Sequence, residues 1–565
     1  MIIKSQKISF LIYLMTMGLI ILFSNLSYGQ GKNEEVTIIA PYIPTISDAT
    51  KIPFRPEITQ GEHETPSFDY NYITKKYDTR MELNPVEPLK YSEGKQDEVY
   101  RNYANIGFGN YVTPYIEFMA SSLRSEKYQF GVRLKHHSSQ GKIKDYPSSA
   151  YSHDLVSVFG KSFSTNHTLA AEVGYKRDVV HFYGFLPDSF PDVAYSKEDI
   201  RQRFQLVEGS LKYSSNYREK YMLNHLLGFG FNVFSDLYGT TESQLSFQAG
   251  IDKAFKTGKD DFNHSFALDI GVDFLGYRDS ISSSHPVFVM FKPVYRFSLA
   301  QYRFEAGLSI NSASRSSENQ STGGFNVFPV LKAEVVIVDQ KLEAFAEVSG
   351  NRTINSFRGL AGINPFIIST PQVYYTDEQI KIGGGITGSA GRLNLQADAF
   401  YSYLVDMPLF VIDTSLALQN KFEVIYDNMN LLKLRASLGY VRVNQFSARL
   451  NAAYYHYIPK NEIKAWQMPN YEVGLDAGYT FLEKYTVRTS MLVLGSKYAR
   501  VFKEGEIIPA KIAGAFDLGF GVSYQVNQII SAYVDGSNLL NQHYQRWFNY
   551  PVQGIQVMAG VKLTF

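Results

Sequence analysis

A strict alternation of apolar with polar or small residues, repeated over most of the chain, constrains its fold more than any other feature. Residues 516–524 read FDLGFGVSY, and residues 446–454 read FSARLNAAY. The stretches 393–401 (LNLQADAFY) and 266–274 (FALDIGVDF) follow the same pattern. A period of two places every second side chain on one face of a β-strand. Such segments, separated by polar or proline-containing connections, continue from about residue 100 to the C-terminus, so this region is predicted to be all-β.

The length of these segments distinguishes a membrane barrel from a stack of soluble β-sandwiches. Soluble strands centre on about five or six residues, whereas strands that cross a bilayer need about nine to eleven. Aromatic residues make up 15% of the chain and charged residues 19%, and tyrosines gather at segment ends, as in 401–403 and 454–457. Interfacial aromatic girdles occupy such positions in outer-membrane barrels. Because backbone groups facing lipid must all be paired, the sheet is predicted to close into one large antiparallel barrel.

The number of alternating segments sets the size of the predicted barrel. About 22 strands are expected between residues 99 and 565, and an even number places both ends of the barrel on the periplasmic side. The longer connections should then be extracellular. These predicted external loops are 139–150, 184–199, 353–377, 408–420, 458–469, 500–511 and 539–554.

The N-terminal region has a different composition and divides into two parts. Lys4 and Lys7 precede an uncharged apolar run, and small residues follow at 27–29, so residues 1–29 are predicted to be a secretory signal peptide. The alternative is an uncleaved anchor, for which the apolar run is short. Residues 30–98 contain many prolines, which disfavour long strands and helices. They are interpreted as an extended periplasmic or lumenal segment in which only 34–40 resembles a strand.

The last strand is the most specific single signal. Residues 555–565 alternate strictly, and the chain stops on Phe565. This ending resembles the C-terminal assembly signal of Gram-negative outer-membrane barrels, which the barrel-assembly machinery reads. The resemblance assigns that role to Val561, Leu563 and Phe565.

Two further segments resemble parts of TonB-dependent outer-membrane receptors. Residues 538–544 (NLLNQHY) are similar to a segment near the end of those receptors, and 22 is their strand number. A second stretch is similar to the Ton box, a short strand that pairs with TonB. It consists of Glu35, Val36, Thr37, Ile38, Ile39 and Ala40. One departure is clear, because residues 41–98 are too few for the folded plug domain of that family. The resemblance therefore implies a plug-less barrel of the kind found in the Bacteroidota, with TonB or another envelope protein as partner.

The predicted inner wall is polar and carries charges of both signs. The alternation points the following residues inward: Glu172, Asp269, Asp273, Lys332, Glu334, Glu343, Glu347, Asp398, Lys433, Arg435, Arg449, Asp517, Asp535 and Lys562. A phosphate-type pore would need an excess of Lys and Arg, which this wall lacks. A wide lumen left open would also make the membrane leak. Residues 41–98 are predicted to obstruct it, and infolded loops or a partner are the alternatives.

The motifs that could indicate catalysis or cofactor binding do not lie in the structural setting that those functions require. Residues 383–388 match G-x-G-x-x-G but continue an alternating strand and open no helix. The glycines are therefore interpreted as part of the barrel wall, where they allow a loop or the N-terminal segment to approach closely, and not as a dinucleotide site. His136 and His137 would point to opposite faces of a strand and could not hold one metal ion. The chain has 0 Cys and a formal charge of +1, which exclude thiolate sites and a chain-wide basic footprint for nucleic acid. No enzymatic activity and no cofactor are expected.

Aromatic residues in the predicted loops leave two interpretations open. They are Tyr374, Tyr375, Trp466, Tyr471, Trp547, Phe548 and Tyr550. With the neighbouring Arg546 they have the composition of a binding hot spot, or they belong to the girdle and loop packing. The function is accordingly expected to be solute or ligand uptake or reception across the outer membrane of a Gram-negative bacterium. The alternative is a non-transporting accessory or scaffold barrel in a larger complex.

Overall fold

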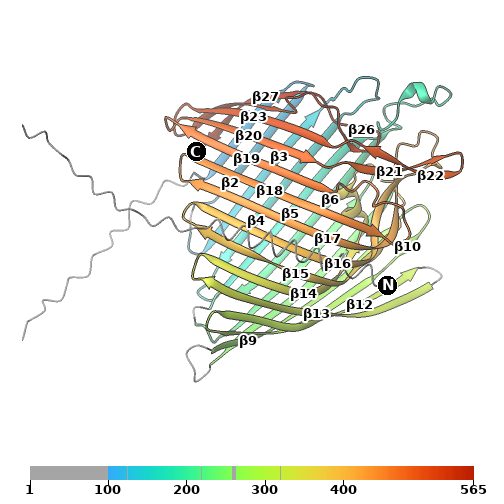
Figure 1. Ribbon diagram of the computed structural model, residues 1–565. Helices are drawn as coiled ribbons and strands as arrows, with labels where there is room; N and C mark the ends of the chain where they lie inside the picture. The colour runs from blue at the N-terminus through green and yellow to red at the C-terminus, as the bar shows by residue number, and fades with distance from the viewer. Residues whose placement is uncertain (1–99, 124, 218, 257–261, 318–319) are drawn as a thin grey trace, which may run out of the picture. The chain divides into compact units, whose positions relative to one another are not determined.

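A computed structural model describes residues 100–565 except 124, 218, 257–261 and 318–319, without the side chains of 315–323. The chain divides into two units, Met1–Ser92 and Glu93–Phe565, and only the second contains described residues. The signal peptide, the Ton-box-like strand and residues 30–98 predicted from the sequence therefore lie outside the described part. Within it, one 23-stranded sheet includes the two-residue β10 (Ser283–Ser284), and the other 22 strands form a closed antiparallel barrel (Figure 1).

The strands of the wall follow one another around the barrel in chain order, each paired with the next. They are β1 (Asn102–Gly109), β2 (Thr113–Ser121), β3 (Tyr128–Ser139), β4 (Tyr151–Phe163), β5 (His167–His181), β6 (Arg201–Ser215), β7 (Leu223–Ser235), β8 (Thr241–Phe255), β9 (Phe262–Arg278), β11 (Val287–Leu299), β12 (Tyr302–Ser317), β13 (Gln320–Val338), β14 (Leu342–Asn355), β15 (Tyr374–Ala390), β16 (Leu393–Ile412), β17 (Phe422–Arg442), β18 (Phe446–Pro459), β19 (Tyr471–Phe481), β20 (Tyr485–Leu494), β23 (Ala515–Gln525), β24 (Ile530–Ser537) and β27 (Gln556–Thr564).

The remaining elements all belong to the longer loops at one end of the barrel. They are the 3₁₀ turn η1 (Pro187–Ser189), the helix α2 (Phe357–Ile363), the hairpin β21 (Lys497–Lys503) with β22 (Glu506–Ile512), and the short pair β25 (Gln545–Trp547) and β26 (Tyr550–Pro551). The other end has short turns, and β1 begins and β27 ends there. By the rule for outer-membrane barrels, the end with long loops is extracellular and the end with short turns is periplasmic. Each predicted external loop lies wholly or partly in the connections at the extracellular end.

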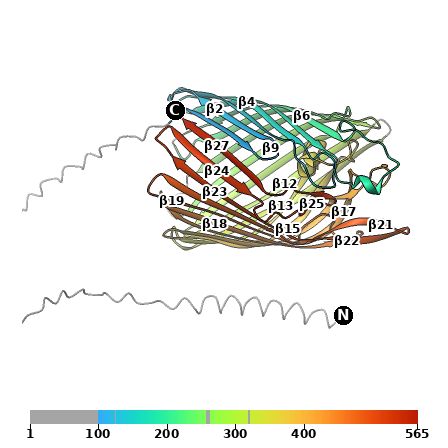
Figure 2. The same cartoon turned by 90° about the horizontal axis from the view of Figure 1, so that it is seen from above.

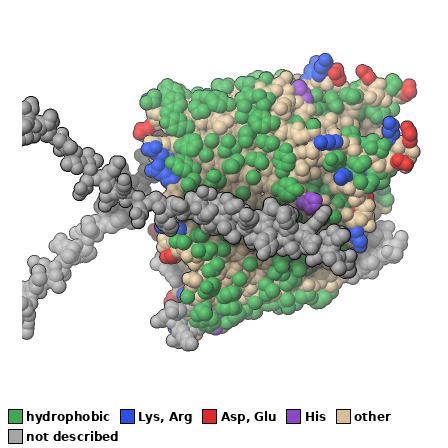
Figure 3. Space-filling view, viewed as in Figure 1, with side chains coloured by type: hydrophobic (Ala, Val, Ile, Leu, Met, Phe, Trp, Pro, Cys, Tyr) green, Lys and Arg blue, Asp and Glu red, His purple; other side chains and the backbone are tan. Residues whose placement is uncertain are grey.

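The alternation in the sequence becomes the two faces of the wall. Apolar side chains such as Phe108, Phe130 and Val534 are exposed on the outside, and Figure 3 shows apolar residues across the wall with charges mainly towards its two edges. A surface of this kind is stable in a bilayer but not in water. The apolar band ends in an aromatic girdle. At the periplasmic end, ring centroids of Phe481 and Tyr485 lie 5.1 Å apart, and those of Tyr485 and Tyr524 lie 4.8 Å apart.

The barrel closes where β27 pairs with β1. Gly107 lies opposite Gly560 in this pairing, and the ring of Tyr533 from β24 lies over both. A Cβ atom added to Gly560 would lie 2.5 Å from the carbonyl oxygen of Ile106 and 2.6 Å from the Tyr533 ring. Glycine is therefore required at this position of the closing strand, because any side chain would collide with backbone.

The glycine run at 383–385 has the same explanation on another strand. It lies in β15, as the alternation predicted, and opens no helix. A Cβ atom at Gly383 would lie 2.0 Å from the carbonyl oxygen of Ala399 and 2.7 Å from the ring of Phe400. Among the described residues, the groups that approach these glycines come from the neighbouring strands β14 and β16 rather than from a loop.

Candidate functional site

The inner face of the barrel is a charged surface whose members largely neutralise one another. Every inward-pointing charge predicted from the sequence lies on the face opposite the exposed apolar residues. Arg303 contacts Glu343 at 2.6 Å and Glu334 at 3.1 Å, and Arg435 contacts Asp398 at 2.8 Å. Arg303 of β12 thus links β13 and β14, and Arg435 joins β17 to the adjacent β16. Because the wall carries charges of both signs in contact with one another, it favours a hydrated path without strong selection for anions or cations.

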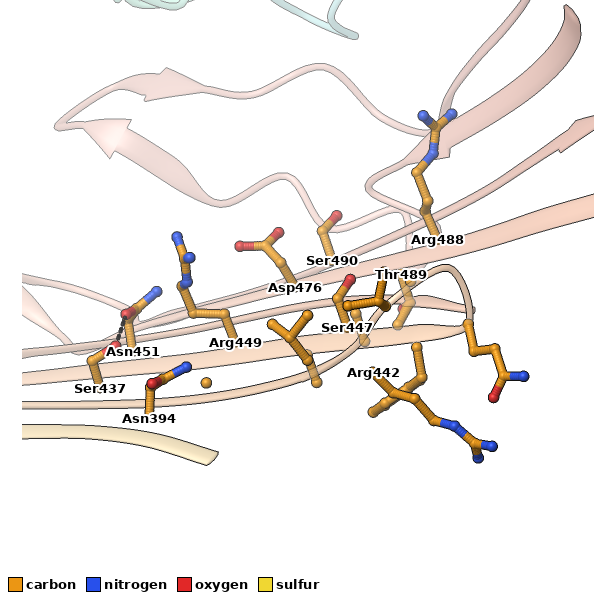
Figure 4. Close-up of a pocket in the computed structure, with 18 of the residues that line it drawn as sticks. Asn394, Ser437, Arg442, Ser447, Arg449, Asn451, Asp476, Arg488, Thr489 and Ser490 are labelled. Atoms are coloured by element: carbon orange, nitrogen blue, oxygen red, sulfur yellow. Dashed lines mark hydrogen bonds between the residues drawn. The ribbon is translucent and has the colours of Figure 1, made fainter. Parts of the chain in front are cut away.

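The periplasmic half of this wall contains a recess of about 1400 Å³. Its floor is made largely of small residues, among them Ser437, Ser447 and Ser490, which leave the space unfilled. Arg449 and Asp476 point into it from neighbouring strands in Figure 4. Arg488, at its edge, is bonded to Asp535 at 2.9 Å. The described part of the lumen therefore contains a wide polar space near its periplasmic end.

Several loops at the extracellular mouth pack together into an apolar cap. Its central part is the plug segment, residues 356–373, which contains α2. Phe357 and Leu360 of α2 are 0% and 1% exposed. Phe357 packs edge-on against Phe204 and Phe234, which belong to the inner face of β6 and β7. In Figure 2 the yellow helix α2 lies within the outline of the strands. An apolar helix is stable there because the wall opposite it, at Phe204 and Phe234, is apolar.

The plug segment is also tied to the opposite side of the mouth. The backbone of Phe422, the first residue of β17, donates to the carbonyl of Phe366 at 2.9 Å and accepts from the N–H of Ile368 at 2.8 Å. The ring of Phe366 stacks on Tyr550 with centroids 3.8 Å apart. The segment therefore spans from the β6–β9 wall to β17 and to the last loop.

The tip of the β16–β17 hairpin is buried on both faces, unlike the rest of the wall. A bulge between Leu404 and Met407 shifts its register. Beyond the bulge, Phe410 packs in the cluster around α2, whereas Leu409 and Val411 pack in a second cluster around Trp466. Consecutive apolar residues are typical of a strand covered on both sides. The tip therefore lies between two layers of loops and forms part of the cap.

Two loop lysines stabilise the cap through cation–π contacts and a hydrogen bond. The Nζ atom of Lys421 lies 4.5 Å from the ring centroid of Phe182 and 4.4 Å from that of Tyr238, and burial lowers the pKa of Lys421. Lys497 donates to the carbonyl oxygen of Arg546, and burial lowers the pKa of Lys497 to about 8. Cations held over aromatic faces in partly buried sites typically contribute about 1 kcal/mol or more.

The loop aromatics predicted as a binding hot spot mostly prove to be packing residues. Trp466, Trp547 and Tyr550 are 0%, 8% and 2% exposed and lie in the cap. Phe548 packs against the cap, whereas Tyr471, at the start of β19, is 40% exposed. The hot-spot interpretation is therefore wrong for both tryptophans and Tyr550. No pattern in the sequence indicates Glu242 or α2. The apolar run at 408–412, which lacks alternation, is the signal of a strand tip buried on both faces.

The two histidines of the pair at 136 and 137 lie on opposite faces of β3. His136 contacts Asp154 at 2.6 Å, whereas the ring of His137 packs against Tyr115 on the other face of β3. The two imidazoles thus do not converge, as predicted. Within the described ranges, no group of three His, Asp or Glu residues could hold a metal ion. The described part of the chain also contains no helix long and apolar enough to cross a membrane.

The predicted assembly signal lies at the closing seam. Val561 and Leu563 belong to β27, and Val561 and Phe565 are exposed on the outer face. The carbonyl oxygen of Phe565 accepts from the backbone N–H of Asn102 at 2.8 Å.

We expect deletion of Phe565, or Phe565→Lys, to reduce insertion, because the last strand must pair with the first and present an apolar face to lipid. The amount of heat-modifiable barrel in outer-membrane fractions measures this. Thr564→Ser is the matched control, and undiminished barrel in the Phe565 variants would refute the assigned role.

Comparisons with known proteins match the fold. No protein-family model and no curated protein matches the chain. Among solved structures, the pyoverdine outer membrane receptor FpvA from Pseudomonas aeruginosa PAO1 bound to pyoverdine aligns with a TM-score of 0.65 and 11% identity, over 83% of this chain and 79% of that one. The siderophore receptor PirA from Acinetobacter baumannii aligns with 0.64 and 10%, over 83% and 81%. The copper transporter OprC aligns with 0.60 and 11%, over 83% and 81%. At these identities the likeness shows the fold, and it confirms the prediction of one large closed antiparallel barrel.

Proposed function

We propose that this chain is a receptor-type barrel in the outer membrane of a Gram-negative bacterium that takes up or receives a ligand. The solved structures with the same fold include a pyoverdine receptor and a copper transporter. The observation that carries the proposal is the arrangement of the lumen. Among the described residues, a polar inner wall carrying charges of both signs leads from the periplasmic recess to a mouth where loops pack into an apolar cap. A wall of this polarity supports a hydrated path, and it also suits the alternative of a wall that holds residues 41–98.

The finer assignments extend this proposal. The small number of residues between the Ton-box-like stretch and the first strand, 41–98, supports a plug-less barrel of the Bacteroidota type. Residues 34–40 are proposed to pair with TonB or another envelope protein as an added strand. Bilayer lipid and the barrel-assembly machinery are the further partners. The alternative, a non-transporting accessory barrel, is favoured by one observation, which is the close packing of the cap around Phe357 and Tyr550.

Conductance of the purified barrel in planar bilayers tests the proposed function. The full-length chain is expected to be closed. Replacement of residues 357–368 by a short Gly-Ser linker is expected to give stable, large conductance in a chain that also lacks residues 41–98, because both the cap and the segment predicted to obstruct the lumen are then absent. The matched control shortens the exposed tip of the β21–β22 hairpin at 503–506, which takes no part in the α2 cluster. Both variants are also made in a chain lacking residues 41–98. A barrel that stays closed without the cap and without residues 41–98 would support the accessory alternative.

A further inference from the structure

A buried carboxylate lies where the plug segment meets the wall. Glu242, the second residue of β8, is 0% exposed and faces the lumen beneath the cap. Its Oε2 atom accepts the backbone N–H of Phe357 at 2.5 Å, at the first turn of α2. Ser356 caps the same turn by accepting from the N–H of Gly359 at 3.1 Å. The charged bond between Glu242 and Phe357 thus joins the start of the plug segment directly to the barrel.

Some of the buried polar atoms next to this bond have no hydrogen-bond partner of their own. The Oε1 atom of Glu242 and the Nε atom of Arg358 have no hydrogen-bond partner among the described residues. Arg358 donates instead to Gln244 at 3.4 Å. A buried carboxylate is costly unless its oxygens are paired. The seated position of the plug segment is therefore stabilised by burial of Phe357 and Leu360 and opposed by the cost of burying this charge.

The far end of the plug segment is held by weaker, neutral bonds. Thr240 Oγ1 donates to the carbonyl of Ser369 at 2.6 Å, and Tyr426 donates to the carbonyl of Gln372 at 2.6 Å. The hydroxyl of Tyr277 donates to Asp279 at 2.7 Å and lies 3.3 Å from the carbonyl of Pro371. Thr240 and Tyr426 are therefore the hydroxyl donors to this end of the segment, and each neutral bond contributes less than a bond to a charged group.

We propose that the plug segment is a movable gate and that Glu242 is the positioning residue that latches it. This inference rests on the proposed function and names the device that would control the path. When the bond to Phe357 is lost, α2 leaves the mouth while the β16–β17 tip and the wall keep their places. The carboxylate then becomes hydrated in the open lumen, which offsets part of the apolar surface that α2 exposes.

A single reporter cysteine tests the latch without reference to transport. The chain has 0 Cys, and Ala361 is only 5% exposed on the buried side of α2. Ala361→Cys should therefore react with a water-soluble maleimide only when the plug segment is unseated. Adding Glu242→Ala is expected to raise the labelling rate by about 10- to 100-fold, the range implied by loss of a hydrogen bond to a charged group. Glu242→Gln, which keeps an acceptor, should give a smaller rise.

The matched control is Glu208→Ala. Glu208 is an inner-wall glutamate on β6 that pairs with Lys176 and does not touch the plug segment. It should leave labelling at the Ala361→Cys position unchanged. Equal labelling in all variants would overturn the latch. If Glu242→Ala does not fold, the labelling rates of Glu242→Gln and Glu208→Gln are compared instead. A faster rate in Glu242→Gln supports the latch, and equal rates overturn it.

A disulfide lock separates the latch from the proposed function. Thr240→Cys with Ser369→Cys joins the plug segment to the wall where the two residues already bond. Oxidation should abolish the extra labelling and any conductance of the Glu242→Ala chain, and reduction should restore both. If the cap deletion conducts but Glu242→Ala changes neither labelling nor conductance, the latch is wrong and the proposed function stands. If labelling rises without conductance in any variant, the gate moves but the uptake proposal fails.

Discussion

Leu450→Arg is expected to destabilise the barrel by about 2–4 kcal/mol, the cost of a cation facing lipid near the bilayer midplane. Leu450 lies on the outer face of β18 and is 38% exposed. Its cross-strand neighbours are Leu438 and Leu475. The arginine would have no anion or water within reach. Urea titration of the folded fraction in lipid vesicles, followed by heat-modifiable gel mobility, measures the difference.

The adjacent residue supplies the control for that substitution. Asn451 points into the lumen, where its Oδ1 atom accepts from Ser437 at 2.8 Å. Asn451→Arg should cost far less than Leu450→Arg, because its guanidinium reaches a hydrated recess. Leu518→Arg and Ser523→Arg form a second such pair on β23. Equal losses within either pair would show that the two faces have been assigned wrongly.

A second large effect is expected at the closing seam. Gly560→Ala should cost about 2–3 kcal/mol, at the upper end for overpacking, since the new methyl group would collide with a backbone carbonyl that cannot rotate away. The new Cβ atom would lie 2.5 Å from the oxygen of Ile106. Because this pairing closes the ring, we also expect slower insertion. The same urea titration and a time course of folding measure the two effects.

Another inner-wall glycine serves as the comparison. A Cβ atom at Gly174 on β5 would have its nearest neighbour at 3.6 Å, which is ordinary contact. Gly174→Ala should therefore be nearly neutral. At Gly107 the closest atom is the hydroxyl of Tyr533 at 2.6 Å, so Tyr533→Ala should relieve Gly107→Ala but only part of Gly560→Ala. A neutral Gly560→Ala would contradict the seam geometry.

The sequence predicted the wall well because each strand carries its own signal. The alternation in 446–454 or 516–524 can be recognised without knowing the partner strand. Each strand has one face towards lipid and one towards the lumen, so its own sequence shows both faces. The inward direction of charges such as Asp398 and Arg435 followed from the same period. Their pairing with each other at 2.8 Å did not, because it depends on the register between β16 and β17.

The cap could not be predicted in this way. Trp466, Trp547 and Tyr550 have the composition of an exposed binding surface, and only their neighbours show that they are buried. The ring of Tyr550 stacks on Phe366, more than 180 residues earlier in the chain, and its hydroxyl bonds to Asn420. No local pattern encodes contacts between loops that the closure of the barrel brings together.

The sequence by itself determined that this protein is a barrel of about 22 strands, which face meets lipid, and where the chain turns. These properties follow from a period of two and from the need to pair every backbone group in a bilayer. Tertiary structure alone decided that the plug segment packs among the other loops at the extracellular mouth and that Glu242 bonds to its first turn. The physical reason is that the cap forms from apolar contacts between distant loops, whose positions exist only after the ring has closed.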